Sequence, residues 1–287
     1  MPSTRMLAIF GAETALPPAG ISSPSANRCD VEEDMAKCQA LLNTSFESLK
    51  SSADLMYPGK GCGFGFTRSP YCSYAHKDGV HVMFSGEVSQ WPGIDVIEAA
   101  HDAFMCNTDL AEADDAHWLL DFYSSFSNTE LAQDENTILQ EALNCLASIR
   151  GSFAFVIYDS LSHRVLASRD ADGVQPLHWG ATSDGQLLFG SHLEDLKDCN
   201  PTATIFPPGT LFSSVHAAVA YNPGPEGWVI AGQEYPGELI SFMKADEEHW
   251  KSVKAIPRIT SKGCVSGAVY KVSSQPDFIH LMTKSSS

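Results

Sequence analysis

The sequence at residues 150–180 is RGSFAFVIYDSLSHRVLASRDADGVQPLHWG, and it predicts three strands in quick succession. The first, at 152–158, is apolar at nearly every position, which is typical of a strand covered on both faces of its sheet. Turn-forming residues separate it from a returning strand at 164–168, and the turn DADG at 170–173 precedes a third strand at 176–180. Because this strand pair is so apolar, we expect further layers both above and below its sheet.

The rest of the chain combines short apolar runs with stretches of helical spacing. Helices are predicted over 30–50 and within 95–148, where apolar residues share three separate helix faces. The Pro- and Ser-rich stretch at 12–27 predicts a surface loop, whereas 221–250 gives no clear assignment. Further strands are predicted at 6–11, 62–67, 71–76, 81–84, 186–190, 210–213 and 264–272. Strands, then helices, then strands again indicate an α+β fold with helices packed against stacked sheets.

The composition restricts the classes of partner. With 287 residues, 44% of them hydrophobic, the chain can bury a large core. A net charge of −17 argues against nucleic acid or an anionic membrane as a partner, because so acidic a surface repels phosphate. No apolar run approaches the ~20 residues that a membrane-spanning helix needs. The first residues also lack the pattern of a secretory signal.

The cysteines and histidines predict neither a disulfide scaffold nor a metal site. The eight cysteines are scattered without a C-x-x-C pair, which favours structural thiols in a reduced, intracellular protein. The ten histidines lack metal-binding spacing such as H-x-x-x-H. We therefore expect no metal and no cofactor, and a cytoplasmic location. A nuclear location and a plastid-targeting role for the first residues stay open.

Four segments carry a resemblance to a known family. In order, they are RGSFAFVIYD, ASRDADGVQPLHWG, DGQLLFGSHLEDL and FPPGTLFSS. Together they resemble the glutaminase domain of class II glutamine amidotransferases, in particular that of asparagine synthetase. Upstream, MLAIFG takes the place of the family's Met-Cys-Gly-Ile-Phe-Gly, and FSGEVSQ takes the place of Asn-Gly-Glu-Ile-Tyr-Asn. The resemblance covers about residues 6–215, and no synthetase domain follows.

The C-terminal segment points to a narrower group. VKAIPRITSKGCVSGAVYKV, at 253–272, is similar to the end of plant stand-alone domains, the stem-specific and aluminium-induced proteins named for YGL and LRDR motifs. Neither motif occurs here, so we expect a divergent plant or algal relative. The resemblance implies the α+β fold of the N-terminal-nucleophile hydrolases, a four-layer αββα sandwich. It would form one domain at 6–272, including the 12–27 loop, with a tail at 273–287.

The family's reaction depends on a residue that this chain lacks. The nucleophile is a Cys at the first residue of the mature chain, and its own α-amino group, with a pKa of ~7.7–8.0, acts as the base. The matching position here is Leu7, which has no nucleophilic atom and is preceded by six residues. The resemblance therefore implies no glutaminase activity of the family's kind.

Other positions match the family's site in part. Its oxyanion hole uses an Asn side chain and the next Gly amide, and here Ser85 replaces the Asn while Gly86 remains. Gly86 is explained equally well as a strand residue with unusual dihedral angles. Asp115 matches the residue that holds the glutamine amino group, although an N-cap role for Asp114 or Asp115 is the structural alternative. Arg68 is the candidate for binding the substrate carboxylate.

Two further features have structural and chemical interpretations. Arg169 and Asp170 match the family, and we interpret them as a turn and strand anchor. Cleavage after Gly61 would expose Cys62 as an N-terminal nucleophile, but it would also separate the MLAIFG strand from the domain.

The preferred hypothesis is a stand-alone amidotransferase-like domain without glutaminase activity, a stress- or growth-responsive binding or regulatory protein. Its expected partner is an unidentified protein or a second copy of the chain. Two alternatives stay open: an active amide hydrolase that uses Cys62 after processing, and a pocket that senses a small amino-acid ligand through residues such as Asp115.

Overall fold

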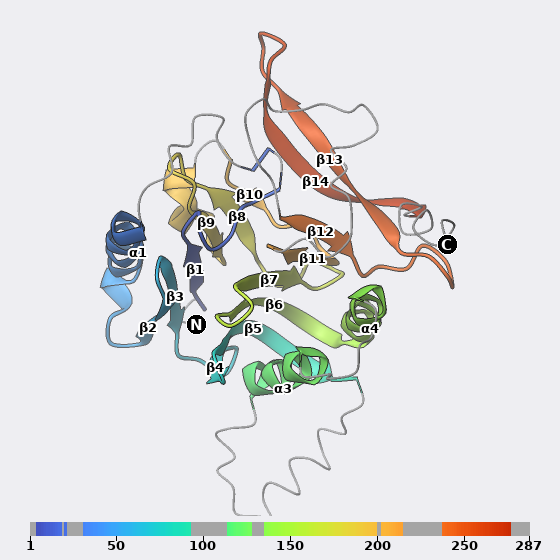
Figure 1. Ribbon diagram of the computed structural model, residues 1–287, viewed down its shortest axis with the longest axis horizontal. Coiled ribbons are helices and arrows are strands. Elements are labelled where there is room, and N and C mark those ends of the chain that lie inside the picture. Colours follow the sequence, from blue (N-terminus) through green and yellow to red (C-terminus); the bar gives the residue numbers. More distant parts are fainter. Residues whose placement is uncertain are drawn as a thin grey trace, which may run out of the picture.

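Two six-stranded sheets lie face to face in the computed structural model, which describes residues 4–18, 20–21, 31–92, 114–127, 135–199, 202–214 and 237–276. Helix α1 (Val31–Ser45) covers the outer face of one sheet, and α3 (Asp115–Ser127) and α4 (Glu135–Ser148) cover the outer face of the other (Figure 1). The predicted α+β fold, a four-layer αββα sandwich, is confirmed.

The first sheet is built around the N-terminal strand. β1 (Met6–Phe10) lies between β3 (Cys62–Thr67) and β9 (Leu187–Gly190), with both pairings antiparallel. All five residues of β1 are buried, as expected for a central strand with layers on both sides. The other strands of this sheet are β2 (Ala53–Gly59), β8 (His178–Ala181) and β10 (Thr204–Ile205).

The second sheet contains the hairpin that the sequence at residues 150–180 predicts. β6 (Arg150–Asp159) and β7 (Arg164–Arg169) pair antiparallel, and β6 is buried without a break from Phe153 to Asp159. On its other side β6 pairs with β5 (Val80–Gln90). The remaining strands are β4 (Cys72–Lys77), β11 (Thr210–Ser213) and β12 (Glu238–Ser241).

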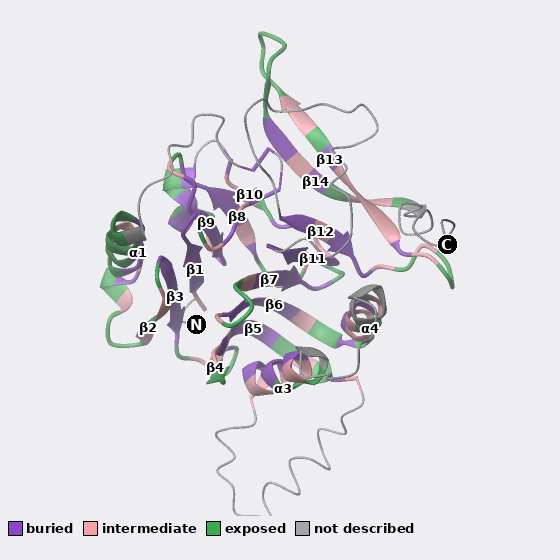
Figure 2. Ribbon diagram, viewed as in Figure 1, coloured by how far each residue is buried: buried purple, intermediate pink, exposed green. Residues whose placement is uncertain are grey.

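The core between the sheets is dominated by aromatic rings. Trp179 is fully buried, and its ring centroid lies 4.9 Å from that of Phe206 and 5.8 Å from that of Phe212. Figure 2 shows this interior as continuous buried strands, with exposed residues concentrated on the helices and turns. Two smaller cores lie under the helices, one beneath α1 and the other beneath α3 and α4.

A two-stranded ribbon extends away from the sandwich (Figure 1). Its strands are β13 (Lys251–Ile259) and β14 (Val265–Pro276), which pair antiparallel. The middle of the ribbon packs on the inter-sheet core, because Tyr270 lies 6.0 Å from Trp179 between ring centroids and Ala268 N donates to Gly20 O at 2.9 Å.

Some elements differ from the sequence-based expectation. β2 and β13 were not predicted, because each contains a proline, which weakens a strand pattern, and β13 also contains several charged residues. β12 falls in the stretch that gave no assignment, and β14 continues past residue 272 to Pro276. The third predicted strand begins at His178 instead of residue 176. The expected helix face of Ile94, Ile97, Ala100 and Phe104 lies outside the described residues.

Candidate functional site

Leu7, at the position of the family's nucleophile, is part of a packed core. It lies in the middle of β1, where its cross-strand neighbours are Gly65 and Gly190. Its side chain is fully buried and belongs to the cluster beneath α1, with Leu42 and Phe46. A Cβ on Gly65 would lie 2.4 Å from the Phe46 ring and 3.0 Å from Leu42, so this glycine leaves room for the end of α1 and the residue that follows it. Leu7 therefore contributes to the attachment of α1.

Ser85, at the position of the oxyanion-hole Asn, lies on β5 of the second sheet and faces the core between the two sheets. Its cross-strand neighbour on β6 is Ala154, which lies in the core between the sheets. The Ser85 hydroxyl is fully buried and accepts a hydrogen bond of 2.5 Å from Gln175 Nε2. This contact joins Ser85 to the turn that follows β7, so the hydroxyl already has a partner inside the protein.

Gly86 is required by the close approach of two strands. Its φ is +129°, and a Cβ at this position would lie 2.0 Å from Ser152 O on β6. Its amide donates to Tyr71 O at 2.9 Å. The same amide would have to be free to bind an oxyanion. Gly86 thus has a complete structural explanation, the one that its dihedral angles allowed from sequence.

Asp115 joins the start of α3 to the end of β5. One carboxylate oxygen accepts from Trp91 Nε1 at 3.0 Å and the other from Val88 N at 3.2 Å. Burial raises the pKa of this carboxyl, and the bonds to Trp91 and Val88 oppose that rise. The N-cap role belongs to Asp114, whose Oδ1 accepts from His117 N at 3.0 Å. A ligand role for Asp115 stays a prediction, and its two oxygens have these partners in the structure.

Arg68 follows β3 on the surface. Its Nε donates to Asp54 Oδ2 at 2.5 Å, and Nη2 pairs with the other oxygen of the same carboxylate. The side chain is 64% exposed, so the ion pair is a surface feature. The side chains at four of these positions are therefore not brought into one cleft: Leu7 faces α1, Ser85 faces the opposite sheet, Asp115 lies at the start of α3 on the outer side of the second sheet, and Arg68 faces solvent.

Cys62, the alternative nucleophile, is the first residue of β3. Its thiol is buried, lies 3.5 Å from Thr14 Oγ1 and has its pKa raised by burial, so it is held in the protonated and poorly nucleophilic form. The preceding Gly61 accepts a backbone bond from Gly11 at 2.7 Å and lies in the tight β2–β3 turn. These contacts give Cys62 a structural role, and they would all be disturbed by cleavage at Gly61.

The turn after β7 is anchored by Arg169. This buried guanidinium donates to three backbone carbonyls: Gln175 at 2.6 Å, Gly173 at 2.5 Å and Phe206 at 3.0 Å. Asp170 closes the turn from the other side by accepting from the amides of Val174 and Gln175, both at 2.9 Å. Arg169 and Asp170 therefore form the turn and strand anchor that we expected from sequence.

Several proteins of known family resemble this chain. Residues 140–231 match the protein family described as "Aluminium induced protein". This match makes residues 140–231 similar to aluminium-induced proteins. The chain is also 39% identical over 99 residues to asparagine synthetase 3 (glutamine-hydrolysing) of Arabidopsis thaliana, a stretch that makes up 33% of this chain and 17% of the relative. The asparagine synthetase of Sandersonia aurantiaca is 40% identical over 100 residues, 34% of this chain and 19% of that enzyme.

The expected resemblance to asparagine synthetases and to aluminium-induced proteins is thus confirmed. The aligned stretches span less than a fifth of the length of these synthetases. Among solved structures, the glutamine PRPP amidotransferase of B. subtilis overlays with a TM-score of 0.42 and 11% identity, covering 87% of this chain and 50% of that one. The aluminium-induced protein match takes in β6, β7, β8 and the turn anchored by Arg169.

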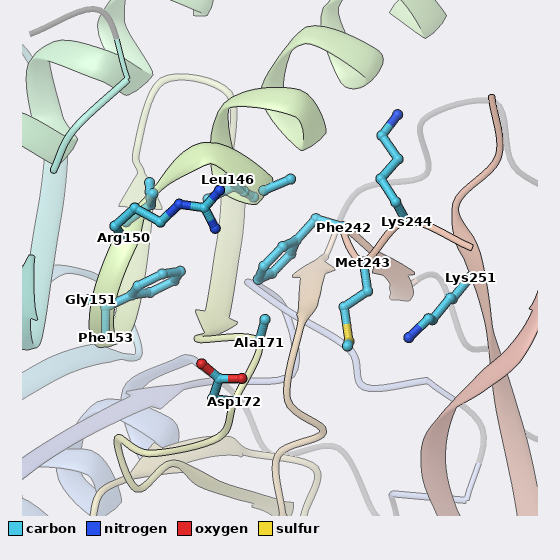
Figure 3. Close-up of a pocket in the computed structure, with 12 residues that line it drawn as sticks. Leu146, Arg150, Gly151, Phe153, Ala171, Asp172, Phe242, Met243, Lys244 and Lys251 are labelled. Atoms are coloured by element: carbon cyan, nitrogen blue, oxygen red, sulfur yellow. The ribbon is translucent and has the colours of Figure 1, made fainter. Parts of the chain in front are cut away.

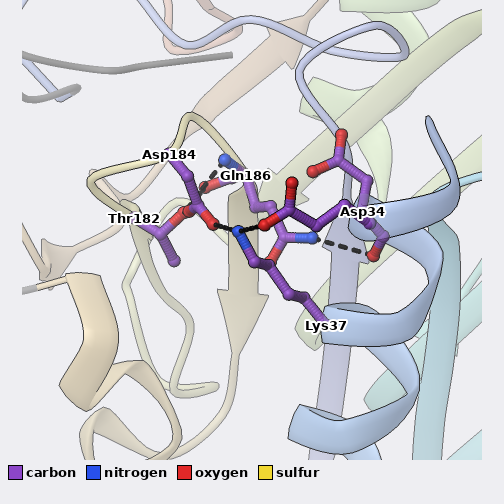
Figure 4. Close-up of polar contacts among 6 residues, drawn as sticks. Asp34, Lys37, Thr182, Asp184 and Gln186 are labelled. Carbon is purple, nitrogen blue, oxygen red and sulfur yellow. Dashed lines mark hydrogen bonds and ion pairs between the residues drawn. The ribbon is translucent and has the colours of Figure 1, made fainter. Parts of the chain in front are cut away.

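Sequence reasoning missed a partly buried polar cluster at the β8–β9 turn (Figure 4). Lys37 Nζ on α1 pairs with Asp184 Oδ2 at 2.7 Å and with Glu33 Oε1 at 2.9 Å. Gln186 Nε2 donates to the backbone oxygen of Asp34 at 3.1 Å. Burial raises the pKa of the Asp34 carboxyl, which is 1% exposed. These contacts fasten α1 to the first sheet.

Neither a side-chain group that could bind a metal ion nor a helix that could cross a membrane is found in the described part of the chain. No group of three or more His, Cys, Asp or Glu is placed to hold a metal ion among the residues that it describes. In that same part of the chain, no helix is both long enough and apolar enough to cross a membrane.

Two histidines pair directly across the β4–β5 hairpin. His76 and His81 are register partners whose rings stack with centroids 5.9 Å apart, and Tyr74 Oη lies 2.7 Å from His81 Nδ1. Burial lowers the pKa of His81, and the neighbouring His76 lowers it further. The folded protein therefore binds fewer protons at His81 than the unfolded chain does.

This pairing predicts a loss of stability in mild acid. As pH falls below ~6.5, the unfolded chain takes up a proton at position 81 that the folded protein resists, so the free energy of unfolding decreases. We expect His81→Phe to weaken this dependence between pH 7.5 and 5 in urea unfolding, although loss of the Tyr74 contact lowers stability at every pH. An unchanged acid dependence in the variant would contradict the assignment to His81.

Proposed function

We propose that this chain is an amidotransferase-like domain that does not hydrolyse glutamine and acts by binding another protein or a second copy of itself. The proposal rests on one observation: the groups at the family's site positions already pack against, or are hydrogen-bonded to, other parts of this protein. Leu7 is packed under α1, the Ser85 hydroxyl is bonded to Gln175, and the Gly86 amide is bonded to Tyr71.

The chemistry supports the same conclusion. Acyl transfer from an amide needs a nucleophile, a base beside it and donors aimed at the developing oxyanion. At residue 7 the side chain has only carbon and hydrogen, and the backbone nitrogen is part of a peptide bond within a strand. The two positions that would stabilise the oxyanion have internal partners.

The names of the related enzymes indicate which activity should be tested in this chain. The names of the asparagine synthetases describe them as glutamine-hydrolysing, and the present chain aligns with only a small part of each. The family description, aluminium induced, supports a stress- or growth-responsive role by analogy. Protein abundance in the source organism with and without aluminium checks that role, and an unchanged abundance counts against it.

The test is glutamate release from glutamine. We expect none from the purified chain, with a glutamine-hydrolysing asparagine synthetase as the positive control. We also expect none from Leu7→Cys, either in the full chain or in a chain begun at Met6 so that Cys is exposed after removal of Met, because the Ser85 and Gly86 positions remain engaged. Glutamate release by the unmodified chain that is lost on replacing one residue, Cys62 included, would overturn the proposal.

A further inference from the structure

A pocket of about 320 Å³ lies on the helix-covered side of the second sheet, where α4 ends and β6 begins. It is completed by the turn after β7, by the segment that follows β12 and by the first residue of β13. Figure 3 shows that the labelled side chains come from segments far apart in the sequence and surround a common space. We propose that this pocket binds a small organic oxyanion, a carboxylate or phosphate monoester carried on an apolar body.

The floor of the pocket is apolar. Leu146, Ile149, Phe153 and Phe242 all line it, and all four are buried. The rings of Phe153 and Phe242 stack with centroids 6.4 Å apart and an interplanar angle of 21°. Such a surface favours a flat or compact hydrocarbon group, because it can be covered without displacing hydrogen-bonded water.

The rim of the pocket carries three cations. Arg150, Lys244 and Lys251 line it, against one acidic residue, Asp172. Figure 3 shows the Arg150 guanidinium extending toward Phe242 and the Lys251 ammonium extending toward Met243. Within the described ranges, neither Arg150 nor Lys251 forms an ion pair with an acid. Lys244 lies over the Trp250 ring at 3.6 Å, and Figure 3 shows its ammonium extending away from the other labelled side chains, so Arg150 and Lys251 are the cations available to a ligand.

This concentration of positive charge contrasts with the rest of the chain. The sequence has 35 acidic residues against 18 Lys and Arg, yet the pocket is lined by three cations and a single acid, and two of these cations, Arg150 and Lys251, extend toward its other side chains. A guanidinium presents paired donors that fit the two oxygens of a carboxylate or phosphate, and such charge-assisted bonds are stronger than neutral ones. Together, the rim selects an oxyanion and the floor selects an apolar group attached to it.

The volume of the pocket and the charges around it restrict the class of ligand further. Ligand pockets commonly have volumes of ~300–1,000 Å³, so this one suits a molecule of about one ring. The C-terminus of α4 and the Asp172 carboxylate place negative charge at its border. A free inorganic anion therefore lacks the apolar contacts needed to offset that repulsion, and we expect it to bind poorly.

This site is separate from the positions compared with the glutaminase. Phe153 faces the helices, whereas the next residue on the same strand, Ala154, faces the other sheet together with Ser85. Because alternate residues of a strand point to opposite faces, the pocket and Ser85 lie on different sides of the second sheet. The inference thus holds whether or not the chain hydrolyses glutamine.

Ligand-observed NMR titration of the full chain tests the proposal with four probes: phenylacetate, phenyl phosphate, the neutral phenylacetamide and inorganic phosphate. We expect one or both aromatic anions to bind, and phenylacetamide and inorganic phosphate to bind at least about tenfold more weakly, since a hydrogen bond to a charged group is worth ~1.5–3 kcal/mol. The stronger of the two aromatic anions distinguishes a carboxylate site from a phosphate site.

Charge-removing variants locate the binding. Arg150→Gln and Lys251→Gln are each expected to weaken the preferred anion by about tenfold or more. The matched control is Lys262→Gln, which removes the same charge from the ribbon turn away from the pocket and is expected to leave the affinity unchanged. Equal binding of phenylacetamide, equal binding of inorganic phosphate, equal loss in the control, or no binding of either aromatic anion to the folded chain would each overturn the proposal.

Discussion

Replacement of Gly86 by alanine is expected to lower the free energy of unfolding by about 3–5 kcal/mol. Two effects combine at this position. A φ of +129° is strained for any residue with a side chain, and the new methyl group would lie 2.0 Å from Ser152 O. The obstacle is a backbone carbonyl of the neighbouring central strand, so no side-chain rotation can relieve it. Urea unfolding measures the change.

Gly263→Ala is the matched control, because it separates the backbone strain of a positive φ from the steric clash of the new methyl group. Gly263 also has a positive φ, +79°, but a Cβ there would meet no atom within 4 Å. We expect this variant to lose only about 1 kcal/mol. If both variants were equally stable, the close approach of β5 and β6 would not explain Gly86, and a role for its amide in ligand binding would have to be reconsidered.

Arg169→Met is expected to destabilise the protein by a similar amount, about 3–5 kcal/mol. The methionine keeps much of the buried volume but removes the donors to the carbonyls of Gly173, Gln175 and Phe206. Each acceptor that loses its partner out of contact with water weakens the fold. The turn that carries Gln175, and with it the contact to Ser85, would lose its anchor. Chemical denaturation of the purified variant measures the loss.

Two further variants sharpen the test of Arg169. Lysine at this position should not restore stability, because a single ammonium cannot reach three carbonyls that a planar guanidinium spans. Arg68→Met removes a guanidinium whose partner is the surface carboxylate of Asp54, and it should change stability by less than about 1 kcal/mol. A small effect of Arg169→Met, comparable with that of Arg68→Met, would contradict the role of the anchor.

The fold could be predicted largely because its central strands are so apolar. The stretch from Phe153 to Asp159 is buried without a break, and the sequence SFAFVIY already indicates a strand with cover on both sides. The edges were harder to predict. β2 includes Pro58 and β13 includes Pro257, and each of these strands pairs with only one other strand in the described part of the chain, so the hydrophobic pattern is weak.

The residue types at the candidate site could be predicted from the sequence, but the directions and contacts of their side chains could not. The absence of a nucleophile at Leu7 is visible in the sequence, whereas the direction of its side chain depends on the pairing of β1 with β3 and β9. Gln175 illustrates the same limit. Nothing in the local sequence DGVQP indicates that its amide reaches Ser85, 90 positions earlier, because that contact depends on how the turn, which Arg169 also bonds, is placed against β5.

The anchoring of the ribbon has a consequence for protein synthesis. Tyr270 packs on Trp179, and Ala268 bonds to Gly20, so segments near both ends of the chain close the same interior. A ribosome releases these segments far apart in time, and domains that fold during translation do so as their residues emerge. Trp179 consequently stays uncovered on that side until Tyr270 has left the exit tunnel, and the nascent chain exposes this aromatic surface while residues 180–270 are being added.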